Sequence, residues 1–232
     1  MKVAVISDIH ANLEALKAIL EDVEKENVEA IICLGDFVGI CTSPNEVCEI
    51  LKGRENLVAV KGDYDQAVIT GEVIGFDNLS RKSIEWTKRK ITEINLKFLQ
   101  ALNNFEGRRL KEYNILILHG SPDNYLGGHI YDDTPQEKLE EFFRKTEADI
   151  ILAGNTHIPF IKKFEKKFVI NPGSVGQPRD GDNRASYAIL EIENSEIRVK
   201  IKRISYNIKK EIEKMKSEKL PSGLGERLYA AW

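Results

Sequence analysis

Five short apolar runs, each followed by a residue that can bind a metal ion, are the feature that most constrains the fold of this chain. The runs span 2–7, 30–36, 56–63, 114–120 and 149–157. Short, nearly all-apolar runs are typical of strands buried on both faces of a parallel sheet. In parallel α/β folds the ligand site lies outside the carboxyl ends of the strands. We therefore expect the polar residues that end these runs to converge on one sheet edge, and they are Asp8, His10, Asp36, Asp63, His119, Asn155 and His157.

The segments between these runs carry helix signals. Asn12 is placed to cap a helix with one apolar face, and Ser43 to cap a second helix with Pro44 in its first turn. Residues 66–106 have a mostly helical pattern, and Thr134 stands before another helix. The spacing of three apolar residues predicts a last helix, and they are Ile208, Ile212 and Met215.

After residue 165 the pattern changes to that of closely spaced strands. The stretches "FVINPG", "SYAILEIE" and "EIRVKIKRI" predict successive strands of a second sheet that is rich in antiparallel pairs. We find no internal repeat, low-complexity tract or linker. The sequence therefore predicts an α/β protein with two sheets in a single domain that spans residues 1–232.

Charge and composition exclude some classes of function. The chain of 232 residues has a net charge of −3, so no bulk basic field is available to recruit nucleic acid or an anionic membrane. No apolar run approaches the length of a membrane span, and no signal peptide precedes the first strand. Cys33, Cys41 and Cys48 form no close pair, which favours reduced thiols in a cytoplasmic protein. The oligomeric state stays open, with a homodimer as one candidate.

The polar residues at the strand ends have a shared chemical explanation. A single histidine or aspartate at such a position is more often a structural hydrogen-bonder or a helix cap than a ligand. Several such residues at one sheet edge favour metal binding over these structural roles. Packed carboxylates repel one another, and buried charges are costly unless paired or metal-bound. Mixed aspartate, histidine and amide ligands suit Mn, Fe, Zn or Ni. A carboxylate that bridges two such ions would give a two-metal centre, which makes hydroxide at neutral pH and holds phosphoryl oxygens during in-line displacement.

Six motifs make this interpretation more specific. They are "DIH" (8–10), "GDFVG" (35–39), "KGDYD" (61–65), "LHGSP" (118–122), "GNTHIP" (154–159) and "NPGSVGQPRDGD" (171–182). In their order and spacing the chain resembles the calcineurin-like metallophosphoesterases, and in particular their small prokaryotic branch, over nearly its whole length. The resemblance implies a four-layer α/β/β/α sandwich with two mixed β-sheets, and two metal ions between the sheet edges.

The resemblance also implies roles for individual residues. Asp8, His10 and His157 would hold the first metal ion. Asp36 would bridge both ions, and His119 falls at a ligand position of the second. The two ions are expected to be divalent, with Mn favoured and Fe, Ni, Zn or Mg as alternatives.

Three positions depart from the family pattern, and all of them concern the second ion and the proton donor. Asp63 stands where the family usually has Asn, and Asn155 where it usually has His. The extra carboxylate lowers the net charge of the site by about one unit, and the oxygen-rich ligand set favours Mn or Mg over Zn. Tyr64 stands where many members have a catalytic His. Its unperturbed pKa of roughly 10 prevents the same role at neutral pH, although its hydroxyl could donate a hydrogen bond to a phosphoryl oxygen.

Further residues are candidates for binding the phosphate or covering it. The backbone amides of 173–176 could approach an anion. Arg179 and Arg184 could supply a bidentate phosphate contact, and ion pairs with nearby aspartates are the alternative for both. The loop 121–133 is a candidate cap over the cleft, with two glycines for mobility. It carries His129, which is either the missing proton donor or a histidine in an exposed loop.

These features together predict a metal-dependent phosphoesterase. The favoured reaction is hydrolysis of a small or nucleotide-like phosphodiester by hydroxide that bridges the two ions. Asp36 and Tyr64 are the predicted catalytic residues, and Arg179 and Arg184 the predicted substrate-binding residues. The alternative is a non-catalytic metal-binding scaffold or regulatory protein on the same fold, which the three departures favour. The expected partner is a small phosphoester, without a membrane or a clear nucleic-acid surface.

Overall fold

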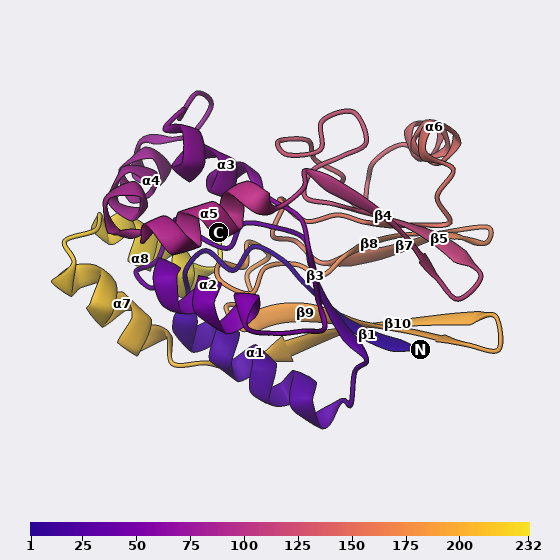
Figure 1. Cartoon of the computed structure of the whole chain (residues 1–232), viewed down its shortest axis with the longest axis horizontal. Helices are drawn as coiled ribbons and strands as arrows, with labels where there is room; N and C mark the ends of the chain where they lie inside the picture. The colour runs from indigo at the N-terminus through magenta and orange to yellow at the C-terminus, as the bar shows by residue number, and fades with distance from the viewer.

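The computed structural model describes residues 1–232 as two five-stranded sheets with helices on their outer faces (Figure 1). In the first sheet the strand order is β10 (Glu196–Ile204), β9 (Ala185–Glu193), β1 (Lys2–Ile6), β2 (Ala30–Cys33) and β3 (Leu57–Ala59). In the second sheet the order is β4 (Phe105–Leu110), β5 (Tyr113–Leu118), β6 (Ile150–Leu152), β8 (Lys167–Asn171) and β7 (Phe160–Phe164).

Both sheets are mixed, as the resemblance implies. β1, β2 and β3 run parallel, and so do β5, β6 and β8. β9 pairs antiparallel with β1 and with β10, while β4 and β7 are antiparallel edge strands. The prediction that the strands after residue 165 form one second sheet is wrong, because β9 and β10 complete the first sheet. Most of β9 is buried, and its local apolar pattern does not specify which sheet it joins.

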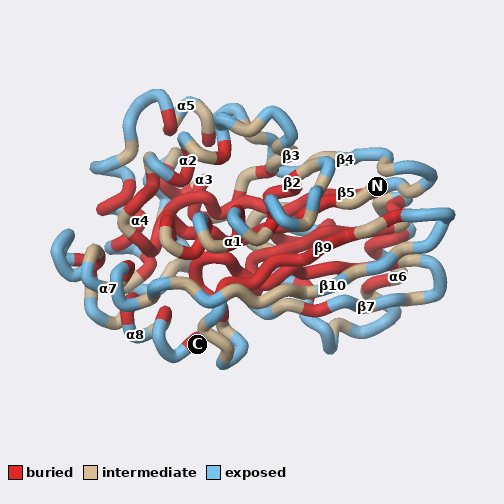
Figure 2. Tube along the Cα trace, turned by 90° about the horizontal axis from the view of Figure 1, so that it is seen from below, coloured by how far each residue is buried: buried red, intermediate tan, exposed pale blue.

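Three hydrophobic clusters hold the layers together. The largest joins the first sheet to α1 (Leu13–Lys25), α2 (Pro44–Lys52), α3 (Asp63–Thr70), α4 (Asn78–Lys90), α5 (Glu93–Ala101), α7 (Ile208–Ser217) and α8 (Ser222–Ala230). The second lies between the sheets and includes Val5 of β1 and Ile117 of β5. The third packs α6 (Gln136–Thr146) on the second sheet through residues such as Phe142. The result is the expected α/β/β/α order, with β9 in the buried centre (Figure 2). The single domain over residues 1–232 stays a prediction.

Local signals explain how some of the helices begin. Asn12 caps α1, because its side-chain oxygen accepts the backbone N–H three residues further on at 3.1 Å. α2 begins at Pro44, as predicted, but Ser43 makes no side-chain capping hydrogen bond. Thr134 is not a cap either, since α6 begins two residues later and the Thr134 hydroxyl accepts a hydrogen bond within its own turn.

The segment 56–106 differs from the prediction at its boundaries. β3 ends at Ala59 and α3 begins at Asp63, so Asp63 lies in the first turn of a helix. The reason is local, because a carboxylate oxygen of Asp65 accepts the N–H of Gly62 at 3.0 Å and starts the helix there. The predicted helical region consists of three helices, α3, α4 and α5. The predicted last helix is present as two separate helices, α7 and α8.

The segment after β10 folds back onto loops from three other parts of the chain. The Tyr206 hydroxyl accepts a hydrogen bond from the side chain of Asn12 at 3.2 Å. Arg227 of α8 forms an ion pair with Asp77, just before α4, at 3.0 Å. The carbonyl of Ala231 accepts the N–H of Gly181 at 3.0 Å. No helix in the structure combines the length and the apolar composition that a membrane crossing requires.

Candidate metal centre

Loops that follow five strands carry the predicted ligands to one end of the two sheets. The residues are Asp8 and His10 after β1, Asp36 after β2, Asp63 after β3, His119 after β5, and Asn155 and His157 after β6. Positive φ angles, from 52° to 67°, occur at Asp8, His10, Asp36, Asn155 and His157. Asp, Asn and His tolerate this region better than most non-glycine residues, and such backbone conformations gather at functional sites. The chain therefore turns sharply after β1, β2 and β6, which keeps these ligands next to the sheet ends.

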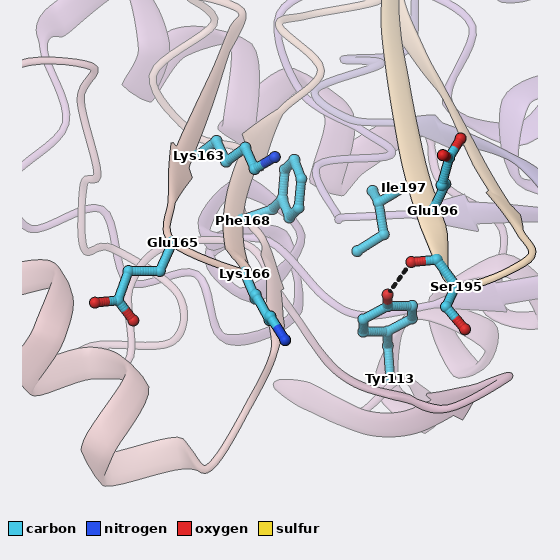
Figure 3. Close-up of a pocket in the computed structure, with 8 residues that line it drawn as sticks. All are labelled: Tyr113, Lys163, Glu165, Lys166, Phe168, Ser195, Glu196 and Ile197. Atoms are coloured by element: carbon cyan, nitrogen blue, oxygen red, sulfur yellow. Dashed lines mark hydrogen bonds between the residues drawn. The ribbon is translucent and has the colours of Figure 1, made fainter.

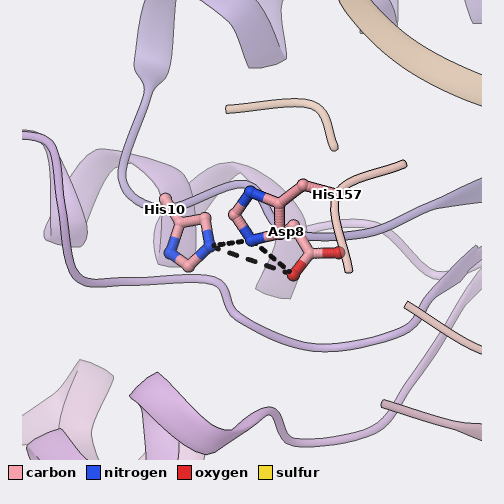
Figure 4. A group of neighbouring side chains, drawn as sticks. All are labelled: Asp8, His10 and His157. Carbon is pink, nitrogen blue, oxygen red and sulfur yellow. Dashed lines mark hydrogen bonds and ion pairs between the residues drawn. The ribbon is translucent and has the colours of Figure 1, made fainter. Parts of the chain in front are cut away.

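Asp8, His10 and His157 form one compact cluster (Figure 4). Oδ1 of Asp8 lies 3.2 Å from Nε2 of His157 and 3.9 Å from Nε2 of His10. The two Nε2 atoms are 3.1 Å apart, and all three residues are buried. One carboxylate and two imidazoles at these separations match the ligand set of a single divalent cation.

A second cluster shares Asp8 with the first and adds Asp36 and His119. Oδ2 of Asp36 lies 3.4 Å from Nε2 of His119 and 3.5 Å from Nε2 of His10. Its other oxygen accepts the backbone N–H of Tyr64 at 2.9 Å, which fixes the carboxylate. Asp36 therefore lies between a histidine of each cluster, where a bridging carboxylate would be placed.

The backbone orients two of the histidines. Nδ1 of His119 lies 2.8 Å from the carbonyl oxygen of Leu34, and Nδ1 of His157 contacts the carbonyl oxygen of Gln177. A ring nitrogen that donates to a carbonyl leaves the other nitrogen unprotonated and free to bind a metal ion. Nδ1 of His10 has no hydrogen-bond partner. The backbone thus prepares the Nε2 atoms of His119 and His157 as ligands.

Unpartnered buried atoms show that divalent cations fit this site. Oδ1 of Asp8, Oδ1 of Asp63 and Nε2 of His119 are buried without a hydrogen-bond partner. Buried polar atoms are nearly always satisfied, so several unsatisfied ligand atoms in adjoining clusters indicate cation binding. The donor set of carboxylate oxygens and imidazole nitrogens is one that Mn, Fe, Zn and Ni accept.

Several side chains in and beside the two clusters have shifted pKa values. Burial raises the pKa of Asp36 to about 6. Burial and the charge of Asp36 raise the pKa of Asp63 to about 8. Burial lowers the pKa of His10 and of His157, whereas Asp36 outweighs burial at His119 and raises its pKa. The charge of His157 lowers the pKa of Asp8 despite its burial. Without a metal ion Asp63 therefore retains a proton near neutral pH, which a divalent cation would displace.

Asp63 lies on the solvent side of these clusters, and Asn155 is buried beside the loop 121–133. Oδ1 of Asp63 is 4.0 Å from Nε2 of His119, and 27% of the Asp63 side chain is exposed. The side-chain nitrogen of Asn155 donates to the carbonyl of Gly128 at 2.9 Å and to that of Leu126 at 3.3 Å. Because the nitrogen is used in this way, the amide oxygen is the atom left to bind a cation.

Tyr64 has its hydroxyl committed to a neighbouring helix. The hydroxyl donates to Oγ of Ser80 at 2.6 Å, and Ser80 donates to Asp77 at 3.1 Å. The Tyr64 ring meets the ring of His10 edge-on, with 4.7 Å between centroids. Burial raises the pKa of Tyr64. Ser80 and Asp77 were not expected from the sequence: the stretch "DNLS" signals a helix cap, but no local pattern places that cap beside a metal centre.

A cavity of about 340 Å³ opens beside the two clusters. Its lining includes Asp63, Tyr64, His129, Asn155, His157 and Arg179. Arg179 donates to the side chain of Gln177 at 3.3 Å. Arg184 does not line the cavity and forms a surface ion pair with Asp182 at 2.6 Å. The ion-pair alternative therefore describes Arg184, while Arg179 faces the site.

The turn at 173–176 does not offer its amides to an anion, so that expectation is wrong. The N–H groups of Val175 and Gly176 instead donate to carbonyls of the loop after β1, at 2.9 and 2.8 Å. A Cβ atom at Gly176 would lie 2.0 Å from the carbonyl oxygen of Ile9, so only glycine permits this approach. The turn holds the loop that carries Asp8 and His10.

A larger hollow, of about 440 Å³, lies at the other end of the sheets (Figure 3). It is bordered by the β7–β8 and β9–β10 turns, and the Tyr113 hydroxyl donates there to the carbonyl of Ser195 at 2.7 Å. Its two lysines, Lys163 and Lys166, are exposed, and neither metal-binding cluster lies near it. The chemistry of the molecule is thus concentrated at the opposite end.

Comparisons with known proteins agree with this geometry. Residues 1–195 match the profile of the calcineurin-like phosphoesterase superfamily domain. The uncharacterized protein MJ0912 of Methanocaldococcus jannaschii is 37% identical, over 98% of this chain and 97% of that protein. Phosphodiesterase MJ0936 of the same organism is 27% identical, over 75% of this chain and 83% of that protein.

The fold has a close counterpart among solved structures. The crystal structure of a metallophosphoesterase from Sphaerobacter thermophilus superimposes with a TM-score of 0.84 and 31% sequence identity. The match covers 100% of this chain and 99% of that chain. It therefore includes both sheets and the segment beyond residue 195. On these grounds the chain belongs to the calcineurin-like phosphoesterase superfamily, in its branch of small phosphodiesterase-type proteins.

Proposed function

We propose that this protein is a metal-dependent phosphodiesterase that hydrolyses small or nucleotide-like phosphodiesters. The observation that carries the proposal is the pair of buried clusters that share Asp8 and border an open cavity. Membership of the superfamily supports action on phosphoesters. The name of the relative MJ0936 supports a diester as the substrate.

Two divalent ions fit the side chains that are present. Asp8, His10 and His157 would hold the first ion, Asp36 would bridge both, and Asp63, His119 and Asn155 would complete the second site. When bound, such ions lower the pKa of water to near neutrality and neutralise charge on the phosphoryl group. We propose Mn²⁺ as the native ion, because the second ligand set is rich in oxygen.

The chain's own residues then bind and orient the substrate. Arg179 brings a permanent positive charge to the cavity wall, and we assign it to the phosphoryl oxygens. Tyr64 acts as a positioning residue: its N–H fixes Asp36 and its ring packs on His10. Arg184 has no place in this proposal, because Asp182 holds its guanidinium at the surface.

Asp63 gives the preference for diesters a physical basis. It adds a carboxylate beside His119, at the side of the site that borders the cavity. A phosphomonoester carries between one and two negative charges near neutral pH, whereas a diester carries one. The additional carboxylate therefore repels a monoester more strongly than a diester.

A non-catalytic metal-binding scaffold is the second candidate. It is favoured by Tyr64, whose hydroxyl is engaged with Ser80 at the position where the family has its proton donor. Both candidates are proposed to be cytoplasmic, because all three cysteines are free and buried, as reduced thiols in a cytoplasmic protein would be. Measured turnover separates the two candidates.

Hydrolysis of bis-p-nitrophenyl phosphate and p-nitrophenyl phosphate, with and without Mn²⁺, tests the proposal. We expect Mn²⁺-dependent turnover that is faster on the diester and falls to background in His157→Ala. Arg198→Ala is the matched control, because Arg198 forms only an exposed ion pair far from the cavity. Turnover no higher than that of His157→Ala, in protein shown by calorimetry to bind Mn²⁺, would overturn the enzyme and favour the scaffold.

A further inference from the structure

The cavity has no proton donor at the position where the family usually has one. Hydrolysis of an alkyl or nucleoside ester releases a basic oxygen, and a positioned acid contributes roughly 10²–10⁴-fold to such a step. Tyr64 occupies that position, but its hydroxyl donates to Ser80 at 2.6 Å. A buried phenol that is already committed to another acceptor is a poor acid at neutral pH.

Most other ionisable groups that line the cavity are also committed. Asp77 accepts backbone N–H groups at the start of α4 and pairs with Arg227. Arg179 is assigned to the phosphoryl oxygens. Asp63 and His157 belong to the proposed ligand set. His129 is the one remaining ionisable side chain in the lining.

The loop that carries His129 is held to the metal centre. The side chain of Asn155 donates to the carbonyl of Gly128, next to His129, at 2.9 Å. A Cβ atom at Gly128 would lie 2.1 Å from the hydroxyl of Ser121, so this glycine serves close packing rather than the expected mobility. The His129 ring stacks on Tyr131, with 5.7 Å between centroids and 2° between planes. These contacts place the His129 backbone beside Asn155 and its ring beside Tyr131.

His129 also lies on the correct side of the cavity. Asn155 and His157 form a buried inner wall, whereas His129 and Ile74 form an exposed rim. In an in-line displacement the nucleophile and the leaving oxygen stand on opposite sides of phosphorus. A nucleophile that arises at the buried ligands therefore directs the leaving oxygen toward the rim.

We propose that His129 is the general acid that protonates the leaving oxygen, an inference that rests on the proposed phosphodiesterase function. A hydroxide oxygen forms the new bond to phosphorus, and the bond from phosphorus to the ester oxygen breaks with its electron pair on that oxygen. The imidazolium of His129 gives its proton to this oxygen, and the neutral ring regains a proton from solvent. Burial lowers the pKa of His129, while the charge of Asp63 opposes that effect. The negative charge of a bound phosphodiester would favour the imidazolium and so oppose the effect of burial.

Two diesters that differ only in the leaving group test this role. Ethyl p-nitrophenyl phosphate releases a weakly basic phenolate that needs little protonation, whereas ethyl phenyl phosphate releases a more basic one. In His129→Gln we expect kcat on the phenyl ester to fall on the order of 10²-fold, and kcat on the nitrophenyl ester to change by less than about threefold. Binding of Mn²⁺, followed by calorimetry, should stay within about twofold, because His129 is not a ligand.

Asp133→Asn, an exposed change in the same loop, is the matched control and should leave both esters unaffected. An equal loss on the two esters in His129→Gln, or no loss on either, would overturn the acid role of His129 while leaving the phosphodiesterase intact. Wild-type protein that binds Mn²⁺ but hydrolyses neither ester would overturn the phosphodiesterase, and the acid role with it. A selective loss of turnover on the phenyl ester in His129→Gln would support both the acid role of His129 and the phosphodiesterase function.

Discussion

The two sides of the metal centre are held in place by different means. On one side is the inner cluster of Asp8, His10 and His157. All three residues have positive φ angles and are buried. The carbonyl of Gln177 orients His157, and the turn that includes Gly176 holds the loop after β1. The inner cluster is thus fixed mainly by the backbone.

On the other side is the outer wall of Asp63, Tyr64 and His129. Tyr64 is fixed by a hydroxyl–hydroxyl contact with Ser80, and His129 by stacking on Tyr131. The Asp63 side chain is partly exposed. The outer wall is therefore positioned mainly by side chains, each of which a single substitution can replace.

The departures from the family pattern follow this division. The sequence resemblance predicts the usual family ligands at the inner cluster and places two of its departures, Asp63 and Tyr64, in the outer wall. Asn155, which also differs, lies between the two and holds the His129 loop. A change in the inner cluster would disturb the folded backbone as well as the metal ion. The outer wall can vary with less effect on folding, so the substrate-facing side is where the chemistry diverges.

The largest effect is expected from Asp8→Asn, which alters the inner cluster and the ligand shared with Asp36 and His119. The substitution keeps the shape of the side chain but removes a buried charge from both ligand sets. Breaking a buried charge pair costs about 3–5 kcal/mol, or roughly 10²–10⁴ in Mn²⁺ affinity. Calorimetry measures that affinity, with Asp133→Asn as an exposed control. Affinity within threefold of the wild type would show that the inner cluster does not hold the ion.

Asp63→Asn is expected to act on the outer wall alone. Solvent screens a partly exposed carboxylate, so we expect a loss of roughly tenfold in affinity for the second Mn²⁺ and little change for the first. The ratio of diester to monoester turnover should fall, because the monoester meets less repulsion. An unchanged ratio would contradict the role of Asp63 in substrate choice.

Stability measured against pH tests whether the carboxylates retain protons when no metal is bound. The pKa of Asp36 is raised to about 6 and that of Asp63 to about 8, from an ordinary value of 3.8. At these two carboxyls the folded state binds protons more tightly than the unfolded chain, so their contribution to metal-free stability falls as pH rises from about 4 to 8. Mn²⁺ displaces these protons, so its stabilising effect grows over the same range. Thermal unfolding should show a Tm increase with Mn²⁺ several degrees larger at about pH 8 than at about pH 6, and an equal increase would contradict the shifts.

The smallest effect is expected from Tyr64→Phe. The change removes the hydrogen bond to Ser80, which costs about 1 kcal/mol, or a Tm decrease of about 2–4 °C. Diester turnover should stay within about threefold, because the backbone N–H that fixes Asp36 remains. A loss of 100-fold on ethyl phenyl phosphate would assign the acid role to Tyr64 and remove it from His129.

The sequence predicts the inner cluster better than the outer wall because its signals are local. Apolar runs that stop at Asp8 or Asp36 mark strand ends, and the parallel arrangement brings those ends together. The turn at 173–176 was misassigned for the opposite reason. Its amides bind a loop more than 160 residues earlier in the chain, which no local pattern reveals.

Non-local contacts also explain the other differences. β9 joins the first sheet by pairing with β1, and nothing within its own sequence selects that partner. The contact between Tyr64 and Ser80 joins two helices across an intervening loop. The sequence leaves two roles open for His129, because its place at the cavity depends on Asn155, which is distant in sequence. Where the position of a residue depends on such pairings, residue types and their spacing are insufficient to predict it.

The segment β10–α7–α8 lies beyond residue 195, where the match to the superfamily domain ends. Yet Arg227 holds Asp77 at the cavity rim, and the carbonyl of Ala231 holds the loop that follows Arg179. The entrance to the cavity is thus partly built by an appendix to the shared domain. This segment supplies none of the clustered metal-binding side chains, so it shapes the way into the cavity and leaves the metal centre itself to the shared domain.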